Sequence, residues 1–344
     1  MQKIREKEVK MSETIETEMV DILLASYNTN IHFLKIQIDS ILNQTYTNIH
    51  LIISDDASTK KEVKKVLQEY SKKDKRIELY IQRKNLGYLK NFEFLLTKSK
   101  ANYIMFSDHD DVWYANKVKK SMETLKQKKV DLVYTDAEQI DEKGILLHKS
   151  YLRYKHMPII EGKDTILAFS RHIAIGCSQL FTKKIKEQML PFSEQMMAHD
   201  WISVYLASKE NGIACIDEPL FGYRLHNSNV FGGRNLKQNL SRWKQENGKR
   251  YQAYIQYRDK AITEAYLNGA QMCETYNQRL GRKLNTSEQK VLQYYRTIQK
   301  TKWINLHIGT YKKFLGFDNM KARFWKEMMM FHFPIISYLV YVIH

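Results

Sequence analysis

Residues 103–113 read YIMFSDHDDVW and carry both a structural and a chemical signal. The first five residues are mostly apolar, which is typical of a short buried strand. Three aspartates follow within four residues, at Asp108, Asp110 and Asp111. Carboxylates this close repel one another, and a bound cation relieves that repulsion. Oxygen ligands suit Mg²⁺ or Mn²⁺, although the same cluster also fits a polar turn that caps the next helix.

Outward from this stretch, apolar runs alternate with segments of helical periodicity. Further strands are predicted at 20–25, 49–54, 77–82 and 132–135, and helices at 31–43, 61–71, 88–99 and 115–127. Strands that alternate with helices form a mostly parallel sheet with helices on both faces. The predicted class is therefore an α/β fold, in which ligands bind beyond the carboxyl ends of the strands.

Polar segments stand directly after these predicted strands. SYNTN follows the first strand, and its Tyr27 either stacks on a nucleobase or packs against the protein. DDAST follows the second strand, where Asp56 suits hydrogen bonds from a base or a ribose. The same residues also suit the N-cap of helix 61–71, so this segment alone leaves both roles open.

Beyond residue 144 the alternation is less regular. Extended segments are predicted at 173–181, 213–217 and 220–225, and a helix at 200–210. Asp200 and Trp201 stand at that helix start, either as a general base beside a sugar platform or as an N-cap beside a buried ring. Arg224 suits a phosphate and His226 a metal ion, although a lone histidine is more often structural.

The ends of the chain differ from its centre. Residues 1–18 contain no apolar core and are expected to be a flexible leader, not a signal peptide. Residues 234–344 are expected to be helical, with a capping signal at Thr286 and Gln289. They end in the apolar stretch FHFPIISYLVYVIH, which is too short to span a bilayer and suits either a membrane interface or the protein's own core.

Net charge and cysteine content narrow the class of protein. The formal net charge of +17 indicates an anionic partner such as a diphosphate, a membrane surface or nucleic acid, or else a lysine-rich solvated surface. The three cysteines are far apart in sequence, which argues against a disulfide framework and for reduced cytosolic thiols.

Taken together, these motifs resemble the family-2 inverting glycosyltransferases of the GT-A fold. The matching segments are SYN, DDAST, NLG, DHDDVW, HDW and YRLHNSN, in the family's order between about Met19 and Gly233. The acidic loop is similar to that of bacterial polysaccharide transferases, rhamnosyltransferases among them. The resemblance implies a Rossmann-like, mostly parallel sheet flanked by helices in residues 19–233, followed by an α-helical C-terminal extension.

The resemblance also implies a role for individual residues. It assigns the donor to Tyr27, Asp56, Asn85, Gly87, Lys90 and Asp108; the Mg²⁺ or Mn²⁺ ion to Asp108, Asp110 and His226; and the acceptor or diphosphate to Trp201 and Arg224. Asp200 matches the catalytic base. One departure is His199, which precedes Asp200 where many relatives carry a second acid. The Q-x-x-R-W motif of processive synthases is absent from the sequence, which favours addition of one or a few sugars.

The implied activity is transfer of a sugar from a nucleotide-diphosphate donor, dTDP-rhamnose or a UDP-sugar, to a glycan or lipid-linked acceptor. We expect a cytoplasmic enzyme, peripheral at the anionic inner face of the membrane, with a homodimer possible. A sugar nucleotidyltransferase and an inactive scaffold of a glycan-assembly complex are the alternatives. The sequence lacks the glycine-rich phosphate loops of other nucleotide-binding folds. Acidic loops at the sheet edge argue against a nucleic-acid partner.

Overall fold

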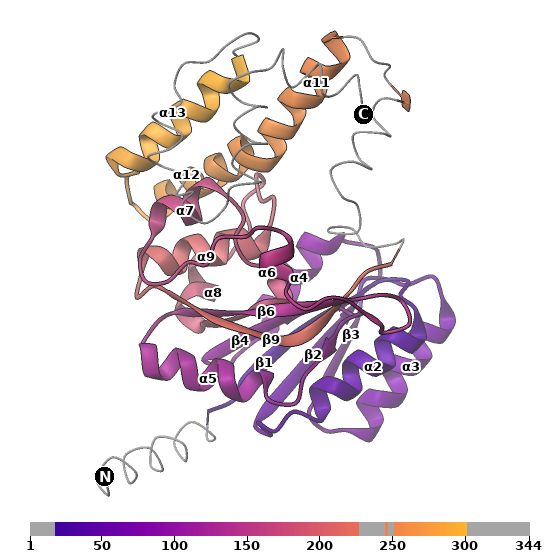
Figure 1. The fold of residues 1–344 in the computed structure, drawn as a ribbon. Coiled ribbons are helices and arrows are strands. Elements are labelled where there is room, and N and C mark those ends of the chain that lie inside the picture. Colours follow the sequence, from indigo (N-terminus) through magenta and orange to yellow (C-terminus); the bar gives the residue numbers. More distant parts are fainter. Residues whose placement is uncertain (1–17, 227–244, 247–250, 301–344) are drawn as a thin grey trace, which may run out of the picture.

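A computed structural model of the protein describes residues 18–226, 245–246 and 251–300. In these residues a mixed sheet lies between two layers of helices, and a further group of helices stacks on one of those layers (Figure 1). The leader at 1–17 and the apolar C-terminal tail lie outside the described residues.

The predicted α/β alternation of the N-terminal half is confirmed. Its strands are β1 (Val20–Ser26), β2 (Ile49–Asp55), β3 (Ile77–Ile81), β4 (Tyr103–Ser107), β5 (Val112–Trp113) and β6 (Leu132–Ile140). Its helices are α2 (Ile31–Leu42), α3 (Lys61–Lys73), α4 (Tyr88–Lys98) and α5 (Lys117–Lys128).

The second half adds shorter elements. The strands are β7 (Leu146–His148), β8 (Gln179–Thr182) and β9 (Ile213–Arg224). The helices are α6 (Tyr151–Tyr154), α7 (Thr165–Ser170), α8 (Lys183–Met189), α9 (His199–Lys209), α11 (Tyr251–Ile262), α12 (Asn268–Arg279) and α13 (Thr286–Lys300), with a π-helical turn at Thr263–Leu267.

The strand order is β3-β2-β1-β4-β8-β6-β9-β5, with β7 paired to β6. Strands β1, β2, β3 and β4 are parallel, and β8 runs antiparallel between β4 and β6. Strand β6 is antiparallel to β8 and therefore runs parallel to β4, and β9 is parallel to β6. The carboxyl ends of the six longer strands therefore lie at one edge of the sheet; these strands are β1, β2, β3, β4, β6 and β9. The predicted ligand-binding segments follow these strands and therefore gather at that edge.

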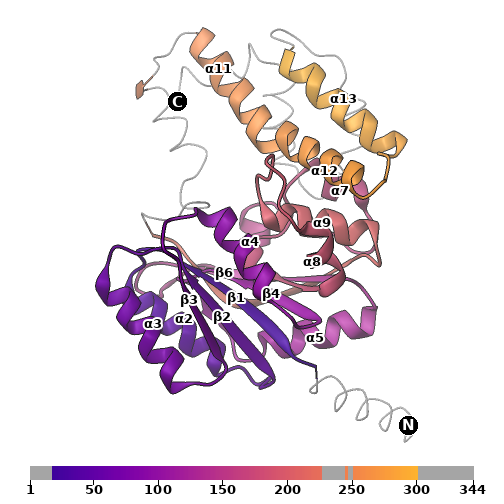
Figure 2. The ribbon, with the colours of Figure 1, turned by 180° about the vertical axis from the view of Figure 1, so that it is seen from behind.

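Alternate side chains of each strand supply the two faces of the core. Leu24 of β1 packs with α2, α3 and α5, whereas Leu23 packs with α4, α8 and α9. Figures 1 and 2 show these helix groups on opposite sides of the sheet. Both residues are fully buried, which is why the strands are apolar on both faces.

Two local predictions need correction. The segment 173–181 was predicted as one strand, but Gly176–Ser178 forms a 3₁₀ turn before the short strand β8. Helix α13 is capped by Asn285, not Thr286: the Glu288 amide donates to Asn285 Oδ1 at 2.9 Å, and Glu288 Oε2 accepts from the Asn285 amide at 2.8 Å. This is a capping box shifted by one residue.

Residues 251–300 share the core of the α/β domain. Helices α12 and α13 lie over α7 and α9 (Figure 1), and the Tyr295 hydroxyl donates to the Ser170 carbonyl at 2.8 Å. Lys209 of α9 forms a 2.5 Å ion pair with the buried Glu288. None of the helices within the described ranges is long and apolar enough to cross a membrane.

Candidate active site

The acidic loop after β4 is the centre of the site. Ligand atoms of Asp108, Asp111 and Cys177 all lie within 4.8 Å of one another. Burial, together with the charge of Asp110, raises the pKa of Asp108 to about 6, and burial raises the pKa of Asp111 well above its usual range. Asp111 Oδ2 is buried and has no hydrogen-bond partner among the described residues. The loop thus holds the Asp111 carboxylate where water does not compensate its charge, beside the half-buried Asp108.

Asp110 lies beside two histidines. His226 Nε2 is 2.7 Å from Asp110 Oδ2, and His109 Nε2 is 4.0 Å from the same oxygen. Burial raises the pKa of Asp110, but the two histidines outweigh it and hold that pKa below its usual value. The structure therefore brings His226 to Asp110, two of the three residues predicted to hold the metal ion.

A buried lysine lies beneath this loop. Lys117 of α5 is fully buried, its Nζ donates to the Cys177 carbonyl, and it stands 3.7 Å from the centre of the Phe221 ring. Burial lowers the pKa of Lys117 to about 7. Sequence reasoning missed Lys117 and Cys177, because neither carries a local signal of its own.

Asp200 is the first acidic residue of α9 and lies close to the acidic loop. Its Oδ2 accepts from the Gly176 amide at 2.9 Å and lies 3.0 Å from His172 Nε2. Burial raises the pKa of Asp200, but His172 and this amide outweigh burial and lower it to about 2. Cys177, next to Gly176, belongs to the acidic cluster. Asp200 and the acidic loop are therefore neighbours across the 3₁₀ turn, and the charge of Asp200 also contributes to the raised pKa of Asp108.

Glycine at position 176 allows the start of α9 to lie this close to the 3₁₀ turn. A Cβ there would lie 3.0 Å from His199 Nε2 and 3.4 Å from Asp200 Cβ. His199, the departure from the family pattern, is buried and stacks on Phe92 with ring centres 4.3 Å apart. Burial lowers the pKa of His199 to about 4, so the ring is neutral at physiological pH and acts as packing.

The predicted donor residues lie along the same edge. Asp56 follows β2 and accepts from the amides of Leu86 at 2.7 Å and Gly87 at 2.9 Å. Asn85 Nδ2 donates to the Asp56 carbonyl at 3.2 Å. Gly87 has a φ of +81°, a conformation that favours glycine, and it is the N-cap residue of α4. Asp56 and the NLG segment therefore form one unit.

Two further donor candidates lie at the surface. Tyr27, directly after β1, is 46% exposed, so its ring is accessible to a planar partner. Lys90 is also exposed and forms a 2.6 Å ion pair with Glu93 one helical turn later.

A model of the glycosyl transferase family 2 domain matches residues 21–190, which include β1 to β4, the acidic loop and the Gly176 turn. The chain belongs to glycosyltransferase family 2. This places the acidic loop and the predicted donor residues inside the matched domain, and Asp200, Arg224 and His226 just beyond it.

Relatives of this transferase are found in bacteria and archaea. An uncharacterised glycosyltransferase of Methanocaldococcus jannaschii is 26% identical over 66% of this chain and 77% of its own length. An Escherichia coli UDP-Glc:alpha-D-GlcNAc-diphosphoundecaprenol beta-1,3-glucosyltransferase, WfgD, is 27% identical over 62% and 79%. A Rickettsia felis glycosyltransferase is 29% identical over 52% of this chain but only 29% of its own length. The family match and these relatives favour a glycosyltransferase over the two alternatives, the sugar nucleotidyltransferase and the inactive scaffold.

Solved structures show the same fold. S. aureus TarS in complex with UDP-GlcNAc superposes with a TM-score of 0.51 at 13% identity, over 82% of this chain and 81% of that one. The mannosyltransferase PcManGT of Pyrobaculum calidifontis, in complex with GDP-Man and Mn²⁺, gives 0.51 at 13% identity, over 94% and 86%. The fold is GT-A, and enzymes of this fold commonly use a divalent metal ion.

Two residues expected on the acceptor or diphosphate side of the transferase lie in the protein interior. Trp201 is 4% exposed, and its Nε1 donates to the Ala168 carbonyl at 2.8 Å. Its ring fills the space left by Gly269 of α12, where a Cβ would come within 2.0 Å of Cη2. This packing speaks against a sugar platform and joins α9 to the C-terminal helices.

Arg224 is also buried, with 3% exposure. Its Nε donates to the Asp110 carbonyl at 2.8 Å, and its Nη1 to the carbonyls of Asp141 at 3.0 Å and Glu142 at 3.2 Å. These contacts give the guanidinium a positioning role: it fixes the backbone of the acidic loop, and its predicted contact with a phosphate has no support in this geometry.

Proposed function

We propose that this family 2 enzyme is an inverting hexosyltransferase of cell-surface polysaccharide synthesis. It would move a sugar from a nucleoside-diphosphate donor, dTDP-rhamnose or a UDP-sugar, to a glycan or a lipid-linked acceptor. The observation that carries the proposal is the contact chain from Asp200 through Gly176 and Cys177 to Asp108. It supports a base and an acidic, cation-binding loop that address one bound sugar.

The residues of the acidic loop fit a divalent cation. Asp108, Asp110 and His226 would hold Mg²⁺ or Mn²⁺, and the unpartnered Asp111 Oδ2 beside them is the kind of buried oxygen that a cation satisfies. When bound, the ion would neutralise the charge that develops on the departing diphosphate. Lys117 offsets part of the carboxylate charge from below.

The donor would lie along the carboxyl edge of the sheet. Tyr27 would stack on the base, and Asp56 would accept a hydrogen bond from it, since each carboxylate oxygen retains a second acceptor position beyond its amide contact. Asn85 and Gly87 would line this pocket, with Lys90 at its exposed rim. Asp108 would face both the ribose and the ion.

The transfer would be a single displacement. The acceptor oxygen attacks the anomeric carbon from the face opposite the diphosphate, the bond from that carbon to the diphosphate oxygen breaks, and Asp200 takes the hydroxyl proton. The low pKa of Asp200, about 2, keeps the carboxylate ionised at physiological pH. Such a weak base removes the proton only as the new bond forms and the hydroxyl becomes acidic. His172 and the Gly176 amide would hold the carboxylate in place.

The reaction would take place in the cytoplasm, with the enzyme peripheral at the inner face of the membrane. The name of WfgD describes a diphosphoundecaprenol acceptor, which supports a lipid-linked substrate here. The net charge of +17 suits an anionic surface and a diphosphate.

A donor panel tests the proposal. Purified protein and a glycan acceptor are incubated with dTDP-rhamnose, UDP-glucose, UDP-GlcNAc or GDP-mannose, with and without Mn²⁺, and nucleotide release is measured. We expect release from one donor class that requires the ion, and NMR of the product should show an inverted anomeric centre. Lack of release from every donor, or a retained anomeric configuration, would contradict the proposal.

A further inference from the structure

The tip of the β6–β7 hairpin and helix α6 expose apolar and basic side chains together. The stretch 143–155 reads KGILLHKSYLRYK, with four lysines and arginines and no acidic residue. Ile145, Leu146 and Leu147 are 59%, 43% and 46% exposed. We call the exposed side chains of this stretch the hairpin surface; they are Lys143, Ile145, Leu146, Leu147, Lys149, Arg153 and Tyr154.

Exposed large apolar side chains are concentrated here. The described residues contain nine of them, and four lie on the hairpin surface within ten positions of the sequence. A single exposed leucine needs no explanation, but a cluster rimmed by charge marks an interaction site.

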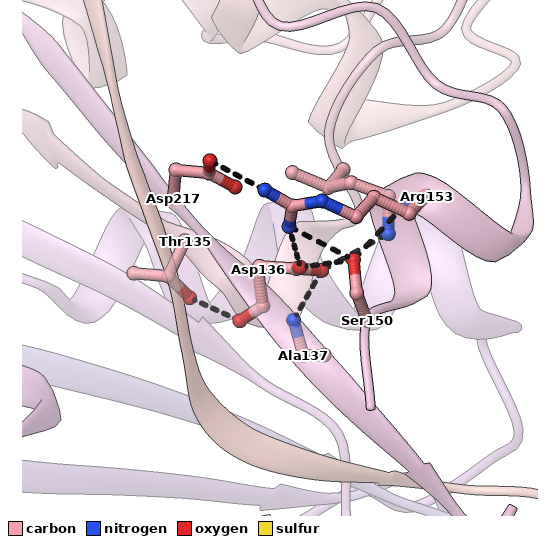
Figure 3. Close-up of polar contacts among 7 residues, drawn as sticks. Thr135, Asp136, Ala137, Ser150, Arg153 and Asp217 are labelled. Carbon is pink, nitrogen blue, oxygen red and sulfur yellow. Dashed lines mark hydrogen bonds and ion pairs between the residues drawn. The ribbon is translucent and has the colours of Figure 1, made fainter. Parts of the chain in front are cut away.

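The hairpin surface is held rigidly on the sheet. Figure 3 shows Asp136 of β6, which is buried and accepts from the Ser150 hydroxyl, while the exposed side chain of Arg153 pairs with Asp217 at 2.7 Å. The His148 ring stacks on Tyr154 with centres 3.6 Å apart, which joins β7 to α6. The apolar tip is thus presented by a folded support.

This surface lies beside the acidic loop. Strand β6 ends at the same sheet edge as β1 and β4, and the hairpin begins there. Arg224 binds the hairpin through the carbonyls of Asp141 and Glu142 and binds the acidic loop through the Asp110 carbonyl. One buried side chain therefore fixes the distance between the two.

We infer that the hairpin surface docks on an anionic phospholipid bilayer. Ile145, Leu146 and Leu147 alternate between the two faces of the hairpin, so insertion of the hairpin end-on at the headgroup boundary would bury all three while the flanking lysines meet anionic lipid. A protein partner fits less well, because lysine is depleted from protein interfaces and a stable interface takes about 800 Å² from each partner. Glu142 borders the stretch but leaves its charge positive.

The inference goes beyond the transfer reaction and holds for any donor sugar. A bilayer contact at this edge would place a lipid-linked acceptor near Asp200.

Vesicle co-sedimentation of the full chain tests it, with phosphatidylcholine vesicles alone and with 30% phosphatidylglycerol as the two lipid probes. The parent should bind the anionic vesicles, and added salt should weaken binding. The triple variant Ile145→Ser, Leu146→Ser, Leu147→Ser should lose at least about ten-fold in partitioning. Lys143→Gln with Lys149→Gln should lose on the order of ten-fold.

Matched control variants test whether the loss of vesicle binding is specific to the hairpin surface or follows from any loss of an exposed apolar or charged side chain. Met19→Ser removes a side chain that is 48% exposed at the opposite sheet edge, and Lys72→Gln with Lys73→Gln removes two exposed charges of α3; both should change partitioning less than two-fold. Equal partitioning of the parent and the triple variant would overturn the inference. So would a parent that does not co-sediment with anionic vesicles. A triple variant with an altered oligomeric state in light scattering would assign the surface to a second copy instead.

Nucleotide release with a water-soluble acceptor distinguishes the two proposals. The triple variant should retain it fully, since none of its positions touches the acidic loop or Asp200. If the parent releases no nucleotide but vesicle binding still depends on the hairpin, the proposed reaction fails and the docking surface stands.

Discussion

Replacing Asp200 with asparagine is the sharpest test of the catalytic assignment. The side chain keeps its shape, and its Oδ1 can still accept from the Gly176 amide, which Asp200 Oδ2 accepts at 2.9 Å. What disappears is the negative charge, and with it both the base and the ion pair with His172 at 3.0 Å. Asp200→Asn should therefore separate chemistry from binding.

Two magnitudes follow from this geometry. Loss of a general base typically costs 10²–10⁴-fold, so kcat should fall at least about 100-fold while the donor KM stays within about two-fold. The pKa of Asp200 is lowered from 3.8 to about 2 in the folded state, which corresponds to about 2 kcal/mol of stability. A lowered carboxylate pKa stabilises the fold above pH about 4, and this contribution is lost as the pH falls towards 2. The variant should therefore be about 2 kcal/mol less stable at pH 7 and equal to the parent near pH 2.

The assay is single-turnover transfer at saturating donor, followed by donor titration and urea unfolding. Asp164→Asn is a matched control, because Asp164 caps α7 and asparagine also caps; its kcat should equal that of the parent. An Asp200→Asn protein that is folded and transfers sugar within about three-fold of the parent would refute Asp200 as the base. A large rise in donor KM with unchanged kcat would show that Asp200 only binds.

The other expected outcomes concern the metal site and the fold. Mn²⁺ at 100 times its Kd should stabilise the parent by about 2.7 kcal/mol, and Asp110→Ala should abolish that gain in thermal unfolding; an unchanged Mn²⁺ response would contradict the ligand role. Burial raises the pKa of Glu210, but its lysine, glutamine and arginine partners outweigh burial and lower that pKa from 4.5 to about 2, which corresponds to about 3 kcal/mol. Because Lys184 and Arg282 are partly exposed, solvent screening reduces the expected cost of Glu210→Gln to about 2 kcal/mol at pH 7. That cost should vanish as the pH falls from about 4.5 towards 2, and a pH-independent difference would contradict the ion pairs. Gly269→Ala should cost about 2 kcal/mol in urea unfolding despite the higher helix propensity of alanine, because its Cβ overlaps the Trp201 ring; a neutral result would contradict this packing.

The sequence predicted the sheet well where periodicity is local. Runs such as Val20–Ser26 are buried on both faces, so their composition reports their environment directly. The segment 173–181 was mispredicted because its backbone is bent at Gly176 by contacts with α9, which begins 23 positions later. Local propensity contains no information about such a contact.

The site was predictable in part for a similar reason. Asp108 and Asp110 stand in one motif, and their neighbourhood follows from the strand that precedes them. Cys177 lies beside the same loop because β8, which follows it, pairs antiparallel with β4. No sequence motif predicts that pairing. The sequence left Trp201 open as a sugar platform or a buried ring, because the space that accepts the ring is created by Gly269, 68 positions later.

The acidic loop contains more negative charge than its surroundings compensate. Arg224 is directed to backbone carbonyls, His226 pairs with Asp110, and Lys117 is so deeply buried that its own charge is weakened at neutral pH. Burial, and then the charge of Asp110, raise the pKa values of Asp111 and Asp108, which these cations do not fully compensate. A loop stabilised fully by the protein would have no need of a ligand, whereas under our proposal this one would gain free energy from a divalent cation that enters with a diphosphate. The charge imbalance that lowers the stability of the fold would then be the source of affinity for the charged donor.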